Sequence, residues 1–292
     1  MNSSFTDSDY PGLFQAADAE SLSAQSAYLR CLSWFLILLI LGSLANLTGS
    51  ATTAASLISA LLFFSALFCS GLLAFKRFEK TWYGTRAVAE SVKTIAWRFM
   101  MRAEPFDTED ITARDQFLSV LQEILQENQH VTKELCDESS SSDAVSTKMK
   151  EVRALAAPER LQFYLTNRVT EQGDWYLRKA RMNKQDGTKW FRRILGLNAI
   201  AVVCALLRVA FSGWTYIPTD VFAFAAACAI SWLQAKRFTE LATSYALTAH
   251  EINISKARSE RVKTDTDLSE FVGDTENAFS REHTQWAARR DA

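Results

Sequence analysis

The feature that most limits the fold of this chain is a run of 45 consecutive residues without a charged side chain, Cys31–Phe75. A second apolar block, Ile194–Ala235, contains only two charges, Arg208 and Asp220. A helix needs about 20 apolar residues to cross the hydrocarbon core of a bilayer, so each block is long enough for two spans. The sequence therefore excludes an ordinary soluble globule and predicts an all-α integral membrane protein.

Each apolar block is expected to turn once, which gives four transmembrane helices in two hairpins. Small and hydroxylated residues mark the first turn at 47–53, and Pro218 can begin a helix after the second turn. Lysine and arginine gather before the first helix and after the second helix of each hairpin, on the side opposite the short turn. Both termini and the middle of the chain are therefore expected in the cytoplasm. The spans are expected near residues 30–47, 55–75, 193–211 and 219–235.

The remaining sequence predicts a cytoplasmic helical bundle. An amphipathic helix is expected over 107–135, a linker at 137–143 and a helix that begins near Pro158. A last helix is expected to begin at Asp265 and to pack on the bundle, with a helix on the membrane surface as the alternative. Gly173 and Gly187 are candidate interruptions of their helix. The predicted segments are an N-terminal segment (1–29), a first hairpin with its following helix (30–106), a helix and serine-rich linker (107–157), a second hairpin with flanking helices (158–262) and a C-terminal amphipathic helix (263–292).

The chain contains a weak internal repeat. Ala74–Phe78 recurs 160 residues later as Gln234–Phe238, and Ala89–Val92 aligns with Ala249–Ile252 at the same offset. Each copy closes a hairpin and opens a polar helix. Because each hairpin crosses the membrane twice, the copies are parallel repeats, which argues against transporters built from inverted repeats.

Two groups of polar residues outside the spans are candidate contact sites. The first forms one helical stripe of tryptophans and charges, which predicts either packing within the chain or a gate and partner surface: Trp82, Arg86, Glu90, Lys93 and Trp97. The second is a basic cluster opposed only by Asp186. It predicts contact with anionic lipid or with a phosphate-rich ligand such as a signalling nucleotide, and comprises Arg178, Lys179, Arg181, Lys184, Lys189, Arg192 and Arg193.

A few polar side chains lie inside the predicted spans. Ser43, Asn46, Ser59 and Asn198 are uncharged groups that can pack helices together or line a pore. Arg208 lies near the outer end of the third span. It is expected to reach the interface or pair with Asp220, with an anion-selecting pore mouth as the alternative.

The sequence gives no support for an enzyme, a metal site or a cofactor. His130, His250 and His283 are far apart, and no nucleophile motif or phosphate-binding glycine loop is present. A net charge of −1 also argues against nucleic acid as a partner.

Three segments resemble a known bacterial family. Trp82–Lys93, with Trp97–Met100 and Pro105-Phe106, resembles the helix after the second span of SLATT proteins, the SMODS and SLOG associating two-transmembrane effector domains. Gln172–Ala180 resembles the lead-in to a second such hairpin, and Ser280–Trp286 is similar to a C-terminal motif of the same group. The resemblance implies two SLATT modules in tandem.

The resemblance implies a multi-pass protein of the bacterial inner membrane that acts in antiphage defence. On activation such effectors are expected to open a gated pore or disrupt the membrane. The implied partners are the lipid bilayer, further copies of the chain, and a cytoplasmic sensor protein or nucleotide second messenger. The alternatives are a membrane-anchored scaffold that binds a cytoplasmic partner, and a small housekeeping channel.

Overall fold

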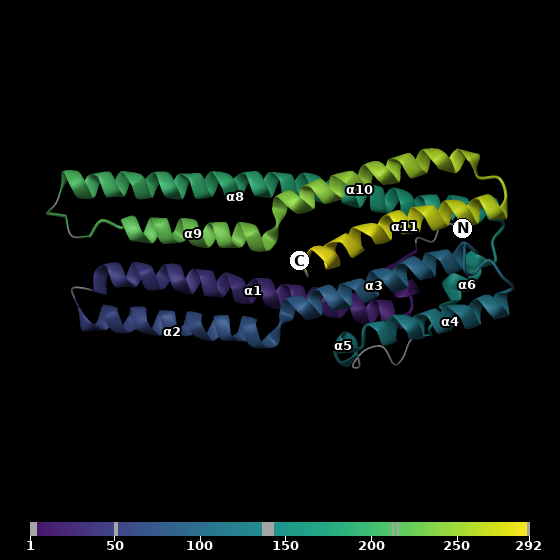
Figure 1. Cartoon of the computed structure of the whole chain (residues 1–292), viewed down its shortest axis with the longest axis horizontal. Helices are drawn as coiled ribbons and strands as arrows, with labels where there is room; N and C mark the ends of the chain where they lie inside the picture. Colours follow the sequence, from purple (N-terminus) through teal and green to yellow (C-terminus); the bar gives the residue numbers. More distant parts are fainter. Residues whose placement is uncertain (1–4, 50–51, 136–142, 212, 215, 291–292) are drawn as a thin grey trace. The chain divides into compact units, whose positions relative to one another are not determined.

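The computed structural model consists of helices and connecting loops, with no β-strand among the residues it describes (Figure 1). It describes residues 5–49, 52–135, 143–211, 213–214 and 216–290, and the side chains of 48–49, 130, 132, 134 and 281–290 are outside this description. Nearly all of the predicted serine-rich linker is therefore outside it too.

The chain separates into two compact units, each assembled from segments that are distant in the sequence. The hairpin unit comprises Ser26–Phe78 and Ala180–Thr243. The helical unit comprises Met1–Gln25, Glu79–Lys179 and Ser244–Ala292.

The hairpin unit contains two helical hairpins, as the sequence predicts. The first consists of α1 (Gly12–Gly49) and α2 (Thr53–Lys76), and the second of α8 (Glu171–Ala210) and α9 (Thr219–Lys236) (Figure 1). Helices α1 and α8 are longer than the predicted spans, because each begins among residues of the helical unit. The apolar run thus forms only the second part of each helix.

Three helical stretches are long and apolar enough to cross a membrane, judged by length and composition within the described residues. They are Gly12–Leu47, Thr53–Met100 and Ala157–Ala210, and they contain the first three predicted spans. Helix α9 forms where the fourth span was predicted but is not among these stretches. It has 18 residues and a length of about 27 Å, close to the thickness of a bilayer core.

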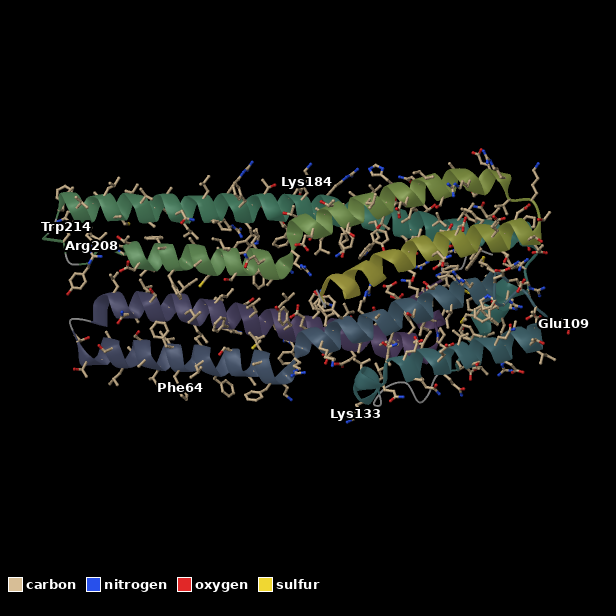
Figure 2. All side chains as sticks on the ribbon, viewed as in Figure 1. Phe64, Glu109, Lys133, Lys184, Arg208 and Trp214 are labelled. Atoms are coloured by element: carbon tan, nitrogen blue, oxygen red, sulfur yellow. The ribbon has the colours of Figure 1, made fainter. Side chains whose placement is uncertain are left out.

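The outer faces of the hairpins are apolar and exposed. Leu61, Phe64 and Leu67 of α2 are 65%, 69% and 65% exposed, and Leu206 of α8 is 64% exposed. Figure 2 shows Phe64 projecting from α2 on the side away from α1. Apolar patches of this extent are unfavourable in water, so the hairpins are suited to a lipid environment.

Contacts between α1 and α2 are close and specific. The hydroxyl of Ser59 donates a hydrogen bond to the carbonyl of Gly42 at 2.9 Å, and both residues are buried. A Cβ atom at Gly42 would lie 2.8 Å from the ring of Phe63. Glycine is therefore required at position 42 for this ring to lie against α1.

The helices of the helical unit pack around one hydrophobic core. Its helices are α3 (Phe78–Met100), α4 (Asp110–Glu127), α5 (Gln129–Thr132), α6 (Thr147–Arg153), α7 (Ala157–Tyr164) and α11 (Asp265–Arg290), with most of α10 (Phe238–Arg258) and the first parts of α1 and α8. Shorter turns are η1 (Asp7–Asp9), η2 (Lys133–Leu135), the π-helical η4 (Leu165–Thr170) and η5 (Ser259–Arg261). Helix α11 contributes Leu268, Val272 and Phe279 to the core, as expected of a helix that packs on a bundle.

The helix predicted over 107–135 is shorter than expected. Helix α4 ends at Glu127, where the main-chain N–H and the side-chain amide of Asn128 both donate to the carbonyl of Ile124, at 3.2 and 2.9 Å. Because asparagine closes the last turn in this way, the apolar periodicity alone misses the end of the helix.

Gly173 and Gly187 do not interrupt their helix, so that prediction was wrong. Both lie inside α8. A Cβ atom at Gly173 would meet Ile252 at 3.2 Å, and one at Gly187 would meet Phe238 at 3.3 Å. These glycines therefore allow α10 to pack closely against α8.

The internal repeat corresponds to the same backbone conformation at two junctions between helices, α2–α3 and α9–α10. Arg77, directly after the last residue of α2, has φ 45° and ψ 41°, and Arg237, directly after α9, has φ 49° and ψ 37°. Both conformations are left-handed. At the end of a helix the residue with this conformation is usually glycine. In each copy a phenylalanine follows and starts the next helix, α3 or α10.

Candidate functional site

A buried ion pair lies in the core of the helical unit. The guanidinium of Arg168 donates to both carboxylate oxygens of Glu276, from Nε at 2.9 Å and from Nη2 at 2.7 Å. The two side chains are 2% and 0% exposed. Such a bidentate pair fixes η4 against α11 in one register, because separating the partners would leave a charge without compensation in a dry core.

Two aromatic residues complete the surroundings of the pair. The hydroxyl of Tyr164 donates to Oε1 of Glu276 at 2.9 Å. The guanidinium carbon of Arg168 lies 4.4 Å from the centre of the Phe279 ring. Burial alone would lower the pKa of Arg168, but the adjacent Glu276 carboxylate raises it, so the arginine stays charged.

The N-terminal segment is part of the same core. The indole N–H of Trp97 donates to the hydroxyl of Tyr10 at 2.7 Å, and both side chains are buried. The ring of Phe5 lies 5.3 Å from that of Trp97, and the main-chain N–H of Phe5 donates to Asn167 in η4. The N-terminus thus connects α3 to the π-helical turn that carries Arg168.

The predicted stripe on α3 lies along the first turns of α1. Arg86 forms ion pairs with Asp18 at 3.0 Å and with Glu90. The ammonium of Lys93 lies 5.6 Å from the ring centres of both Tyr10 and Phe14. The structure thus brings these charges of the stripe into contacts within the helical unit.

The two tryptophans of the stripe differ in their surroundings. Trp97 is fully buried, whereas Trp82 is half-buried and stacks on Tyr83 with ring centres 4.5 Å apart. The carbonyl of Trp82 also accepts a hydrogen bond from Ser21 at 3.4 Å. A gate or partner role for the stripe remains a prediction.

Burial disfavours the charged form of Lys93. Desolvation lowers the pKa of its ammonium, and the attraction of Glu90 only partly offsets this effect. The cost of burying Lys93 is therefore offset only in part, by Glu90 and by the aromatic rings of Tyr10 and Phe14 that face its ammonium.

Arginines also fix the loop that follows α3. Arg153 is 3% exposed and donates to the carbonyls of Phe99, Phe106 and Thr108 at 2.7, 3.0 and 3.0 Å. Arg160 donates to the carbonyl of Met101 at 3.2 Å and pairs with Asp265. These bonds hold the main chain of the loop against α6 and α7.

The polar residues of the predicted spans are not brought together. Ser59 packs against α1, Ser43 is half-buried, and Asn46, Asn198 and Arg208 are exposed. Asn198 donates to the carbonyl of Ile194 in its own helix. Arg208 lies near the α8–α9 connection, which contains Trp214 (Figure 2). Among the described residues no ion pair joins Arg208 to Asp220.

The basic cluster forms part of α8. Arg178, Arg181, Lys184, Lys189, Arg192 and Arg193 are exposed and Lys179 is half-buried. Within the described residues no group of three histidine, cysteine or acidic side chains is arranged to hold a metal ion.

Sequence reasoning missed Arg168, Glu276 and Arg153. Arg168 follows Tyr164 by four residues, and Glu276 follows Val272 by four, so each occupies the apolar face of its own helix. A charged residue at a core position was the signal that could have identified this pair before the structure.

Comparison with family models assigns both halves of the chain. Residues 11–161 match the SMODS and SLOG-associating 2TM effector domain 3, and residues 164–286 match the SMODS and SLOG-associating 2TM effector domain 1. The chain belongs to the SLATT family. It consists of two SLATT modules in tandem, as the sequence resemblance implied. Comparisons with curated proteins and with solved structures found no match.

The two SLATT modules share the core of the helical unit. Trp97 of the first module contacts Tyr164 of the second, with ring centres 5.6 Å apart. Arg98 of the first donates to the side-chain oxygen of Asn277 in the second at 2.8 Å. The ion pair of Arg168 and Glu276 therefore lies in a core to which both modules contribute.

Proposed function

We propose that this tandem SLATT chain is a bacterial inner-membrane effector that opens a gated pore, or otherwise breaches the membrane, in antiphage defence. All four hairpin helices span the bilayer in this proposal, with α9 as the fourth span and both termini in the cytoplasm. The observation that carries it is the exposed apolar surface of the hairpins in a chain made of two effector modules.

The helical unit is the natural place for a gate or sensor. Helices α1 and α8 each begin among residues of the helical unit and continue, without a break, as the apolar helices of the hairpins. A change in the packing of Tyr10, Trp97 or Arg168 therefore has a covalent route into the membrane. Four spans enclose little space, so the conducting form is expected to be an oligomer. The activating signal would come from a cytoplasmic sensor protein or a nucleotide messenger.

The test is the membrane potential of bacteria that express the intact chain, followed with a voltage-sensitive dye through a phage challenge. We expect an early collapse of the potential that is lost when the α2 span is disrupted but still inserted. Trp82→Ala and Glu90→Ala test whether the packing of the helical unit is coupled to the hairpins, because both residues lie on the stripe of α3. A steady potential in protected cells would contradict the pore and favour a membrane-anchored scaffold.

A further inference from the structure

The part of α8 in the hairpin unit begins with exposed cations. We call Arg181, Lys184, Lys189, Arg192 and Arg193 the basic ridge; all five are exposed, and Lys184 is labelled in Figure 2. At about 100° per residue they occupy one side of the helix. The other side carries Gly187 and Trp190, which lie against Phe238 and Trp232.

The ridge has little compensating negative charge. Within the described part of the chain its one ion pair joins Lys189 to Asp186 at 3.0 Å, with side chains 61% and 43% exposed. An exposed pair of this kind is weak and leaves the lysine available. Arg193 lies over the ring of Trp190, 4.8 Å from its centre, which holds the guanidinium near the helix surface.

The first SLATT module has no equivalent of this ridge. Residues 12–30, which lead into its first span, contain one cation, Arg30, and two acids, Asp18 and Glu20. Residues 175–193, which lead into the third span, contain seven cations and one acid. A few cations are enough to orient a hairpin in a membrane, so the excess in the second module calls for a further ligand.

The position of the ridge indicates which ligand it meets. Lys189, Arg192 and Arg193 span about 6 Å of helix, which matches the thickness of one headgroup layer. Exposed apolar side chains of α8 lie among and after these cations, with Phe191 62% and Leu195 61% exposed. Arg181 and Lys184 are about 12 and 8 Å along the helix from Lys189, the nearest of these three cations, so Arg181 lies beyond a Debye length in physiological salt and Lys184 lies at about one.

We propose that the basic ridge binds the phosphate groups of anionic phospholipids, and that Lys189, Arg192 and Arg193 make most of the contact. The aromatic pair Trp190–Trp232 marks the interfacial level, and Lys236 lies 5.8 Å from the Trp232 ring centre on the same layer. The inference rests on the proposed membrane location of the hairpins but requires no pore.

The experiment measures thermal unfolding of the full chain in a non-ionic detergent during titration with short-chain phosphatidylglycerol or phosphatidylcholine. We expect phosphatidylglycerol to raise Tm more than phosphatidylcholine, with a response that weakens in high salt. At about 1 kcal/mol per cation near the surface, Lys189→Gln/Arg192→Gln/Arg193→Gln should weaken the apparent affinity for phosphatidylglycerol about 100-fold.

Three matched variants make the result interpretable. Arg181→Gln/Lys184→Gln should weaken binding much less. Arg114→Gln/Lys150→Gln/Lys263→Gln removes three exposed charges from the helical unit and should leave binding unchanged. Arg192→Lys/Arg193→Lys should retain binding, which separates loss of charge from loss of folding.

Equal Tm shifts with the two lipids would overturn the proposal. It would also be overturned if inositol hexakisphosphate competed fully with phosphatidylglycerol and the Arg181/Lys184 variant lost most binding, because the ligand would then be a soluble polyphosphate. Failure of the pore assay with lipid preference intact would reject the proposed function and leave this inference standing.

Discussion

Arg168 and Glu276 form a bidentate ion pair, 2.9 and 2.7 Å long, in the core that the two SLATT modules share. The pair joins a π-helical turn near the start of the second module to the last helix of the chain. Its strength depends on both partners being present, because the surrounding core excludes water.

Glu276→Gln should therefore destabilise the chain strongly. It leaves the Arg168 charge buried without its partner, at a cost of about 3–5 kcal/mol. For a chain of this length we expect Tm to fall by roughly 10 °C in a thermal unfolding measurement in detergent. The triple variant Arg168→Met/Glu276→Leu/Tyr164→Phe removes every polar partner at once and should recover most of the loss. A fall as large in the triple variant would show that packing, not charge, explains the effect.

Lys93→Met should stabilise the chain at neutral pH. Burial lowers the pKa of Lys93, so between its folded and unfolded pKa values the unfolded chain binds more protons and stability rises with pH. Below that window the full desolvation cost is present. The variant should therefore raise Tm at pH 7, and the gain should shrink toward about pH 10, where the unfolded lysine also loses its charge. A gain that is independent of pH would argue against desolvation as its cause.

Gly42→Ala should loosen the first hairpin. Its Cβ atom would lie within 3.0 Å of three ring atoms of Phe63, so the ring or the helix must move, at a cost of about 1–3 kcal/mol. Gly71→Ala is the matched control in the same hairpin, because nothing lies within 4 Å of its Cβ position. It should be neutral or stabilising by up to about 1 kcal/mol through helix propensity. In detergent the Tm should fall for Gly42→Ala and should stay level or rise for Gly71→Ala.

Arg77→Gly should stabilise the chain by about 1 kcal/mol, because glycine adopts the left-handed conformation without strain. Arg237→Gly should gain less, since it also loses the ion pair of Arg237 with Glu240 at 2.9 Å. The measurement is chemical or thermal unfolding of the two single variants and of Arg77→Ala, which keeps the strain and removes the charge. Stabilisation by the alanine variant would mean that charge repulsion, not backbone strain, is relieved.

Much of the fold could be predicted from local patterns. The uncharged run Cys31–Phe75 and the block Ile194–Ala235 gave both hairpins, because apolar length is a strong and local signal. The repeat around Arg77 and Arg237 indicated where one helix ends and the next begins. The left-handed backbone at these two residues could not be predicted, because arginine rarely adopts it. Gly173 and Gly187 were misjudged because close packing against α10 depends on residues far away in the sequence.

The candidate site was predicted only in part. The stripe from Trp82 to Trp97 was recognised because its members share one helix face. Its contacts, Tyr10 and Asp18, lie in an N-terminal segment with weak patterning of its own. The partners Arg168 and Glu276 are 108 residues apart, so only the three-dimensional structure joins them.

The shared core also limits how such a gene can be rearranged. A recombination break between residues 161 and 164 would separate Trp97 from Tyr164 and Arg98 from Asn277, and would leave two incomplete cores. Neither module keeps these contacts without a complementary half. We therefore expect the two modules to be inherited together.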